Sequence, residues 1–502
     1  MLHFDLDTPL IEIQGKLQND IWTIRHAVEG VQIFGGIGSG KSSGSGRFLA
    51  LKYLRAGFGG LVLTVKPDER EEWIKYCRLV NRIHDLVVIS SQNDNFFNFL
   101  DYETERNSGG QLTENLVDVL KTVIRAGSEK SHGKSEDPFW ENALDMLLFN
   151  VIDLCQLAYG KISVRRMYDI VQSIPRLQED SSRAANKDNT RAYEKAFDKV
   201  DVLVRSKLEK WETQNAARLR GIDDRDIYDE IASADVPEYR QMKYLKQFFE
   251  DTYIPLSEKT RSIVEFSFSG FLFRLLRDPV YKLFCSNPSN IRPEDCLNGK
   301  IILLDLPVKL YDKVGRDAQI MFKYIWQRAM ERRDPNNGTR PVFLWADEAQ
   351  NFLHEHDADY QATARSSRIC TVYITQNLPN YYGNMGGQKG EFKVKSFLGT
   401  LNTKIFHANS DIETNNYASS LFGDHLMEKI SKGSSIGLGN ISKSSNTSAE
   451  YERAIRPERF ISLKTGSPRN QNVVEGFIQR QGEPFANGSN FIKMQFSQNY
   501  SP

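Results

Sequence analysis

The densest group of residues suited to binding a ligand lies close to residue 40. The run reads Gly35-Gly36-Ile37-Gly38-Ser39-Gly40-Lys41-Ser42 and is followed by Ser43. It matches the pattern GxxxxGKS, in which glycines let successive backbone N–H groups surround a phosphate. Lys41 would reach the β- and γ-phosphates, and the Ser42 hydroxyl would ligate Mg²⁺. The run therefore predicts a loop that binds ATP and Mg²⁺, with a ligand-free Gly-rich turn as the alternative.

A phosphate-binding loop of this kind requires a carboxylate at the end of a neighbouring strand to hold the metal. Asp347 and Glu348 directly follow the apolar run 342–345. We expect Asp347 to hold Mg²⁺ and Glu348 to polarise the attacking water as a general base. Asp305 also ends an apolar run, but no second acid follows it. The pair of adjacent acids is thus the preferred candidate, and it indicates hydrolysis.

Three further polar residues could take part in the same chemistry. Gln376 follows the apolar run 371–374, at the strand end where open α/β sheets bind ligands. It could sense the γ-phosphate or belong to an ordinary turn. Arg365 lies eleven residues earlier, with Arg368 close by. Either could be an arginine finger that enters a neighbour's site, or a solvated arginine on a helix.

The elements that would position these residues follow from short apolar runs. Each run is long enough for a buried strand of a parallel sheet. The runs are 31–34, 61–65, 86–89, 301–304, 342–345, 371–374 and 403–406. Residues 48–54 after the phosphate loop have helical spacing, so that region indicates strand, loop and helix. The sequence predicts an α/β fold.

The middle of the chain has a different residue pattern from its two ends. Between about residues 103 and 260 it carries mixed charges and helical periodicity with few β-branched clusters. We therefore expect residues 1–102 and 261–502 to form two parts of one nucleotide-binding domain, and residues 103–260 to form an inserted all-helical domain. The segment 431–448 is rich in Ser, Gly and Asn, which predicts a mobile surface loop.

Two other features suggest sites but carry little weight. His354 and His356 alternate after the acidic motif, but a zinc site needs further ligands, and a pair facing solvent is the simpler interpretation. The stretch from Tyr381 to Lys395 mixes aromatic residues, glycines and lysines, as a loop that binds single strands would. As a lone feature, such a stretch is more often a flexible surface segment.

Composition narrows the class of protein. Lys plus Arg and Asp plus Glu number 65 each, so net charge gives no evidence for a nucleic-acid partner. The five cysteines form no CxxC pair, which favours a reducing cytoplasm over a disulfide frame or a zinc site. No stretch reaches the roughly 20 apolar residues that span a bilayer. We expect a cytoplasmic chain that does not insert into a membrane.

Taken together, the motifs resemble those of type IV secretion coupling proteins of conjugation, the TraG/TraD group of the wider HerA/FtsK superfamily of DNA-pumping ATPases. Beyond the phosphate loop and the acidic pair, the matching segments are Phe97-Asn98-Phe99-Leu100, Asp137-Pro138-Phe139-Trp140, Thr375-Gln376-Asn377, Leu401-Asn402-Thr403-Lys404-Ile405, Arg456-Pro457-Glu458 and Gly482-Glu483-Pro484-Phe485. Their order and spacing cover most of the chain.

The resemblance implies a RecA-like P-loop core with an inserted all-α domain, and a homo-hexameric ring with ATP sites between neighbours. Arg365 matches the arginine of the family. Coupling proteins usually carry two membrane helices before the phosphate loop, where this sequence has 34 residues without such a helix. The expected function is ATP-driven DNA translocation, either with a relaxase in conjugation or with a nuclease or similar effector. The alternative is a nucleotide-gated scaffold, for example in phage defence, that recruits an effector without moving DNA.

Overall fold

The computed structural model describes residues 4–13, 19–106, 112–128, 138–176, 191–336, 338–385, 390–437 and 440–501. The chain divides into two compact units. The first comprises residues 1–89, 293–311 and 325–502, and the second comprises residues 90–292 and 312–324. These units divide near residues 89 and 292, whereas the sequence analysis divides its domains at 102 and 260. The assignment of those domains as a RecA-like core and an inserted domain stays a prediction.

Among the described residues, the first unit is built on a nine-stranded sheet in the order β13-β12-β9-β3-β8-β7-β4-β6-β5. Neighbouring strands from β9 to β5 are parallel, while β12 and β13 are antiparallel at one edge. The strands are β3 (Val31–Phe34), β4 (Gly59–Leu63), β5 (Leu86–Ile89), β6 (Ile301–Leu304), β7 (Val342–Ala346), β8 (Ile369–Thr375), β9 (Thr403–Phe406), β12 (Val473–Arg480) and β13 (Phe491–Ser497). The expected α/β fold with a mainly parallel sheet is confirmed.

All seven apolar runs found in the sequence form strands of this sheet. Strands β3, β4, β6, β7, β8 and β9 are buried at every position. A parallel strand covered on both faces must be apolar along its whole length, which is why the runs are continuous and do not alternate. The carboxyl ends of β3, β4, β7 and β8 lie at one edge of the sheet, and the candidate site forms there.

Helices and two small strands complete the first unit. They are β1 (Pro9–Ile13), β2 (Asp20–Thr23), α1 (Ile24–Val28), the π-helical turn η1 (Ser42–Gly46), α2 (Arg47–Arg55), α3 (Glu69–Leu79), η2 (Ile83–Asp85), η6 (Pro293–Asn298), η7 (Ala349–Asn351), α14 (Asp357–Ala364), α15 (Leu378–Asn384), α16 (Gly390–Gly399), α17 (Ile412–Phe422), α18 (Glu458–Ile461) and η8 (Pro468–Asn470). Helix α13 (Val308–Glu331) contributes residues to both units.

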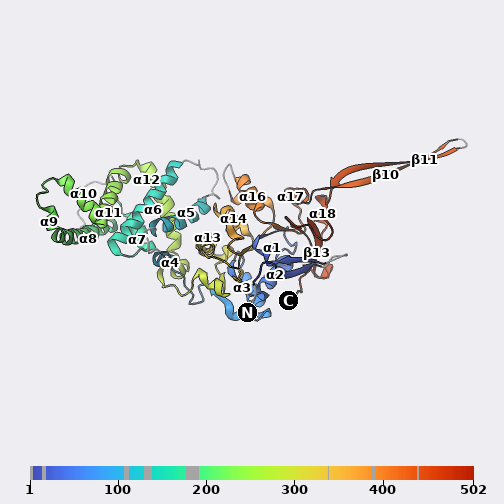
Figure 1. Cartoon of the computed structure of the whole chain (residues 1–502), viewed down its shortest axis with the longest axis horizontal. Helices are drawn as coiled ribbons and strands as arrows, with labels where there is room; N and C mark the ends of the chain where they lie inside the picture. The colour runs from blue at the N-terminus through green and yellow to red at the C-terminus, as the bar shows by residue number, and fades with distance from the viewer. Residues whose placement is uncertain are drawn as a thin grey trace. The chain divides into compact units, whose positions relative to one another are not determined.

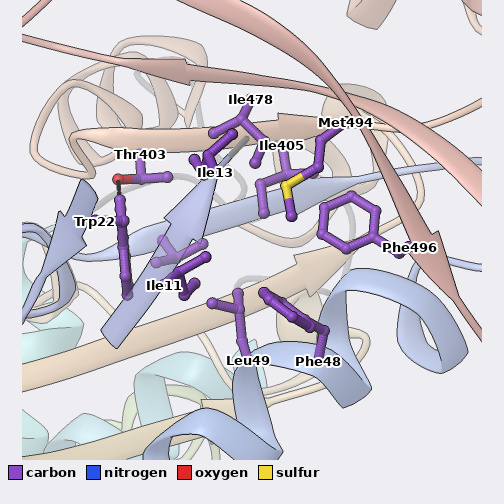
Figure 2. Close-up of a pocket in the computed structure, with 11 residues that line it drawn as sticks. Ile11, Ile13, Trp22, Phe48, Leu49, Thr403, Ile405, Ile478, Met494 and Phe496 are labelled. Carbon is purple, nitrogen blue, oxygen red and sulfur yellow. Dashed lines mark hydrogen bonds between the residues drawn. The ribbon is translucent and has the colours of Figure 1, made fainter. Parts of the chain in front are cut away.

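The core of the first unit encloses a small apolar cavity. Figure 2 shows side chains such as Ile11, Leu49, Ile405 and Phe496 around it, and Trp22 at one side. The cavity measures about 20 Å³. Nε1 of Trp22 satisfies its hydrogen-bonding need within the protein by donating to the Thr403 hydroxyl at 3.3 Å. A space of this size without convergent polar groups is a packing void and not a ligand site.

The described elements of the second unit are all helical. They are α4 (Phe99–Arg106), α5 (Leu112–Ser128), α6 (Pro138–Tyr159), α7 (Val164–Gln172), α8 (Ala192–Gln214), α9 (Ala216–Leu219), α10 (Arg225–Asp235), α11 (Pro237–Gln247), η4 (Phe248–Tyr253), α12 (Glu258–Leu275) and η5 (Lys282–Ser286). Within the described part of the chain, no single helix is long and apolar enough to cross a membrane. One bent pair, Asn142–Tyr159 with Val164–Gln172, reaches that length and composition with a bend of 112°.

The prediction of a mobile surface loop over residues 431–448 is wrong. Strands β10 (Asp424–Gly437) and β11 (Asn440–Arg453) pair antiparallel in register as a long two-stranded ribbon (Figure 1). Alternate residues of β10 near its base, including Leu426, Glu428 and Ile430, share one face of the ribbon. This alternation could not be recognised in the sequence, because the segment is rich in Ser, Gly and Asn. The ribbon is held by hydrogen bonds between backbone groups, which do not depend on the type of side chain.

Candidate nucleotide-binding site

Residues 35–41 form the loop that joins β3 to η1, and Ser42 and Ser43 are the first two residues of η1. Gly38 has φ +72° and Gly40 has φ +80°, a region that side chains with a Cβ rarely adopt. At Gly40 a Cβ would also lie 2.4 Å from a methyl group of Val474. The loop is fixed at its base, where the Gly36 N–H donates to the Ala408 carbonyl at 2.8 Å. The glycines are thus required by backbone conformation and by close packing.

The side chains of the loop differ in their exposure. Ser39 and Lys41 are buried, Gly40, Ser42 and Ser43 border the open cavity described below, and the Ile37 side chain is 89% exposed. A buried lysine needs a compensating negative charge. That charge comes from Glu348 of the acidic pair that follows β7.

Ser42 and Asp347, which lie 305 residues apart in sequence, are in contact. The Ser42 hydroxyl donates to Oδ2 of Asp347 at 2.6 Å, and Oδ1 of Asp347 accepts from the Glu348 backbone N–H at 2.9 Å. Both side chains carry the oxygen atoms that Mg²⁺ prefers. The two residues expected to hold the metal are therefore brought together.

Glu348 lies at the centre of a second group of contacts. Its Oε1 is 3.6 Å from Nζ of Lys41 and accepts from Nε2 of Gln376 at 3.2 Å. Burial alone would raise the pKa of Glu348, but Lys41 and two side-chain amides outweigh burial and leave that pKa below its ordinary value. The carboxylate is therefore ionised at neutral pH, as a general base must be.

The backbone of Glu348 is also unusual. Its φ of 50° and ψ of 49° place it in the left-handed region, which is costly for a residue with a Cβ. Strained backbone of this kind persists only where the surroundings hold it, and it concentrates at functional sites. Here the Glu348 side chain is held by its contacts with Lys41 and Gln376.

A cavity of about 220 Å³ opens beside the loop. On one side it is lined by Gly38 to Ser43, and on the other by Asp347 and by residues between β4 and the first turn of α3, namely Lys66, Asp68, Glu69 and Glu72. Nζ of Lys66 lies 3.7 Å from Oδ2 of Asp347. Burial and the nearby Asp347 raise the pKa of Glu69 to about 8.

Lys66 and Glu69 were not predicted as site residues, although both follow a predicted strand at its carboxyl end. His407, which directly follows β9, was not predicted either. Nε2 of His407 lies 2.7 Å from the Ser45 hydroxyl, and Nδ1 donates to the Glu475 carbonyl at 2.8 Å. Burial lowers the pKa of His407 to about 4, so the ring is neutral and accepts the Ser45 proton. His407 thus anchors the turn that begins the helix after the phosphate loop.

Arg365 lies away from this site in its own chain. It ends helix α14 just before β8, whereas Gln376 follows β8 at the other end of the strand. Seven residues of strand separate these two edges by about 20 Å. The Arg365 side chain is 57% exposed and forms an ion pair of 3.5 Å with Glu29, which precedes β3 at the same edge.

Arg368, the second arginine considered, has a structural environment. Its backbone φ is +53°, its side chain is buried, and its guanidinium donates to the Phe4 carbonyl.

Asp305, the other acid considered for the metal site, directly follows β6. It pairs with Arg70 at 3.3 Å instead of contacting Ser42.

The two weaker features also differ from expectation. The histidine pair does not face solvent as a pair, because His354 is buried and contacts Gln327 through Nε2 at 3.0 Å. In the stretch 381–395, Tyr381 is buried and donates to Gln32 at 2.8 Å. Part of this stretch, residues 386–389, lies outside the described residues. Tyr381 and His354 thus serve packing, whereas Phe392 is 71% exposed.

Comparisons with known proteins point in one direction. Residues 341–465 match the family model described as the TraM recognition site of TraD and TraG. This region contains β7, the acidic pair, Arg365, Gln376 and the ribbon of β10 and β11. No curated protein sequence matches the chain.

Solved structures with a similar fold extend the comparison to nearly the whole chain. The unbound bacterial conjugative coupling protein TrwBdeltaN70 matches with a TM-score of 0.60 and 13% identity, over 96% of this chain and 88% of that chain. TrwB with ADP and Mg²⁺ matches with a TM-score of 0.57 and 13% identity, over 96% and 89%. TrwB with a non-hydrolysable ATP analogue matches with a TM-score of 0.56 and 13% identity, over 95% and 88%. The resemblance to TraG/TraD-type conjugative coupling proteins that the motifs indicate is therefore confirmed.

Proposed function

We propose that this chain is an ATPase that moves DNA, working as a ring of six subunits in the manner of conjugative coupling proteins. The observation that carries the ATPase part is the convergence of Lys41, Gln376 and an ionised Glu348 beside the contact between Ser42 and Asp347. The structures of TrwB with an ATP analogue and with ADP and Mg²⁺ support the choice of ligands. Movement of DNA and the ring rest on the resemblance to coupling proteins.

The residues present fit a magnesium ion. Ser42 and Asp347 supply a hydroxyl and a carboxylate at 2.6 Å from each other. The ammonium group of Lys66, 3.7 Å from Asp347, already places a positive charge beside that carboxylate. Hard oxygen donors of this kind, together with phosphate oxygens, are the usual partners of Mg²⁺ at nucleotide sites. When bound, the ion would neutralise charge on the β- and γ-phosphates.

The chemistry of the chain's own residues then follows from their contacts. Lys41 binds the β- and γ-phosphates in place of its ion pair with Glu348. Glu348 accepts the proton of the attacking water, and Gln376 holds that carboxylate through its amide. The exposed Arg365 cannot reach this site from the opposite edge of the sheet, so it acts on the site of a neighbouring subunit.

Lys41→Ala should abolish nucleotide binding or weaken it severely. The substitution removes the side-chain cation nearest the phosphates and leaves Glu348 buried without its partner. Calorimetric titration with an ATP analogue and Mg²⁺ measures the effect, with Lys52→Ala on the following helix as the control. An unchanged affinity in Lys41→Ala would remove the phosphate-binding assignment.

The motor function is tested by measuring ATP turnover with and without single- and double-stranded DNA, alongside particle mass. A motor couples its two sites, so DNA should raise turnover, and the active species should be a ring. A nucleotide-gated scaffold would bind ATP without this coupling. A fully active monomer would contradict the ring.

A protein partner is also part of the proposal. The matched family model is described by recognition of TraM, and residues 341–465 include a ribbon whose described side chains are largely exposed. A relaxase, a nuclease or another effector fits the two branches of the expected function. A cytoplasmic location is likewise proposed.

A further inference from the structure

Glu69, the first residue of α3, is a buried carboxylate with only half of its hydrogen-bonding capacity used. It is 7% exposed. Oε2 accepts the Val65 backbone N–H at 2.8 Å, while Oε1 has no hydrogen-bond partner among the described residues. A buried carboxylate oxygen without a partner is costly and calls for a specific explanation.

The surroundings of Glu69 indicate what that partner is. Glu69 lines the cavity of 220 Å³ together with Ser42 and Asp347, the two residues that fit Mg²⁺. Residues 38–43 of the phosphate loop line the same cavity, as do the acids Asp68 and Glu72. Carboxyl groups and a hydroxyl therefore border one space in which phosphate oxygens and a hard cation would lie.

Neighbouring acids differ from Glu69 in burial, although Asp68 and Glu72 line the same cavity. Asp68, Glu71 and Glu72 are exposed, whereas Glu69 alone among these four is buried. The hydrogen bond from Val65 explains one oxygen of Glu69 by local turn structure. It does not explain why the other oxygen is buried without a partner on a side chain that lines the cavity with Ser42 and Asp347.

We propose that Glu69 is a further acidic residue of the Mg²⁺ site, whose free oxygen accepts hydrogen bonds from the water molecules that surround the ion. This rests on the proposed binding of nucleotide and Mg²⁺ in the same cavity. Ligands of this outer kind orient the inner ones, and their removal typically weakens metal affinity by about 10- to 100-fold.

Glu69→Gln separates this role from the structural one. The amide oxygen of glutamine can still accept from Val65, while the NH₂ group replaces the oxygen that has no partner. Mn²⁺ binding to the full chain with ADP, followed by electron paramagnetic resonance, should weaken about 10-fold or more. ADP binding without metal should be unchanged. Glu71→Gln, an exposed change on the same helix, should bind Mn²⁺ as the unmodified chain does.

A second variant distinguishes a loss of Mn²⁺ binding from a loss of folding. Glu69→Asp keeps a carboxyl group on a shorter side chain, so it should weaken Mn²⁺ binding less than Glu69→Gln. Equal Mn²⁺ affinity in Glu69→Gln and the unmodified chain would overturn the role of Glu69 while leaving the nucleotide site in place. Failure of the unmodified chain to bind ADP with Mn²⁺ would overturn both proposals.

Discussion

Glu348→Gln should bind ATP and Mg²⁺ normally but turn ATP over about 10²- to 10⁴-fold more slowly, the usual contribution of a general base. Glutamine preserves the shape of the side chain, and its amide oxygen can still face Lys41 and Gln376. It cannot accept a proton from water. Steady-state turnover and the affinity for a fluorescent ATP analogue should therefore separate in this variant.

Asp305→Asn is the matched control for that experiment. Asp305 is the other acid that ends a parallel strand, but it pairs with Arg70 and does not contact Ser42. The control should keep nearly full turnover. If Glu348→Gln hydrolyses ATP at the normal rate while Asp305→Asn does not, the catalytic carboxylate has been assigned to the wrong strand.

The parallel sheet could be predicted from sequence because strands buried on both faces must be continuously apolar. The antiparallel edge could not be predicted in the same way. Strand β12 is buried almost throughout, yet it contains Glu475, Gln479 and Arg480. Long-range partners compensate these polar side chains, such as Lys493 at 2.9 Å from Glu475. A pattern of apolar residues does not reveal such partners.

Some residues of the candidate site could likewise be predicted from sequence, and others could not. The contact of Ser42 with Asp347 was predictable because each belongs to a contiguous motif that follows a recognisable strand. Glu69 is one acid among several at the start of α3, and His407 is a single histidine after a strand. Only the order of strands in the sheet brings these two residues near the phosphate loop. Their burial, which distinguishes them from similar neighbours, has no local sequence signal.

Arg365→Ala should retain ATP binding while losing about 10³- to 10⁵-fold in turnover, the range of effects known for arginine fingers. The guanidinium is needed when negative charge develops in the transition state, so its loss affects catalysis and not ground-state binding. In the isolated chain it pairs with Glu29 at the protein surface. Such exposed pairs contribute little to stability, so the arginine can exchange this partner for a neighbour's nucleotide. Arg459→Ala, another exposed arginine, should leave turnover unchanged.

Mixing two inactive variants shows which subunit the arginine serves. An Arg365→Ala chain combined with a Glu348→Gln chain should recover activity, because some interfaces then join an intact Glu348 to a neighbour's intact Arg365. Fluorescence transfer between labelled chains must first show that subunits exchange, since rings that never mix would hide the effect. A site completed within one chain cannot be restored in this way. If mixed rings stay inactive, Arg365 does not act across the boundary. Arg368 would be a poor replacement, because its guanidinium is already bound to the Phe4 carbonyl.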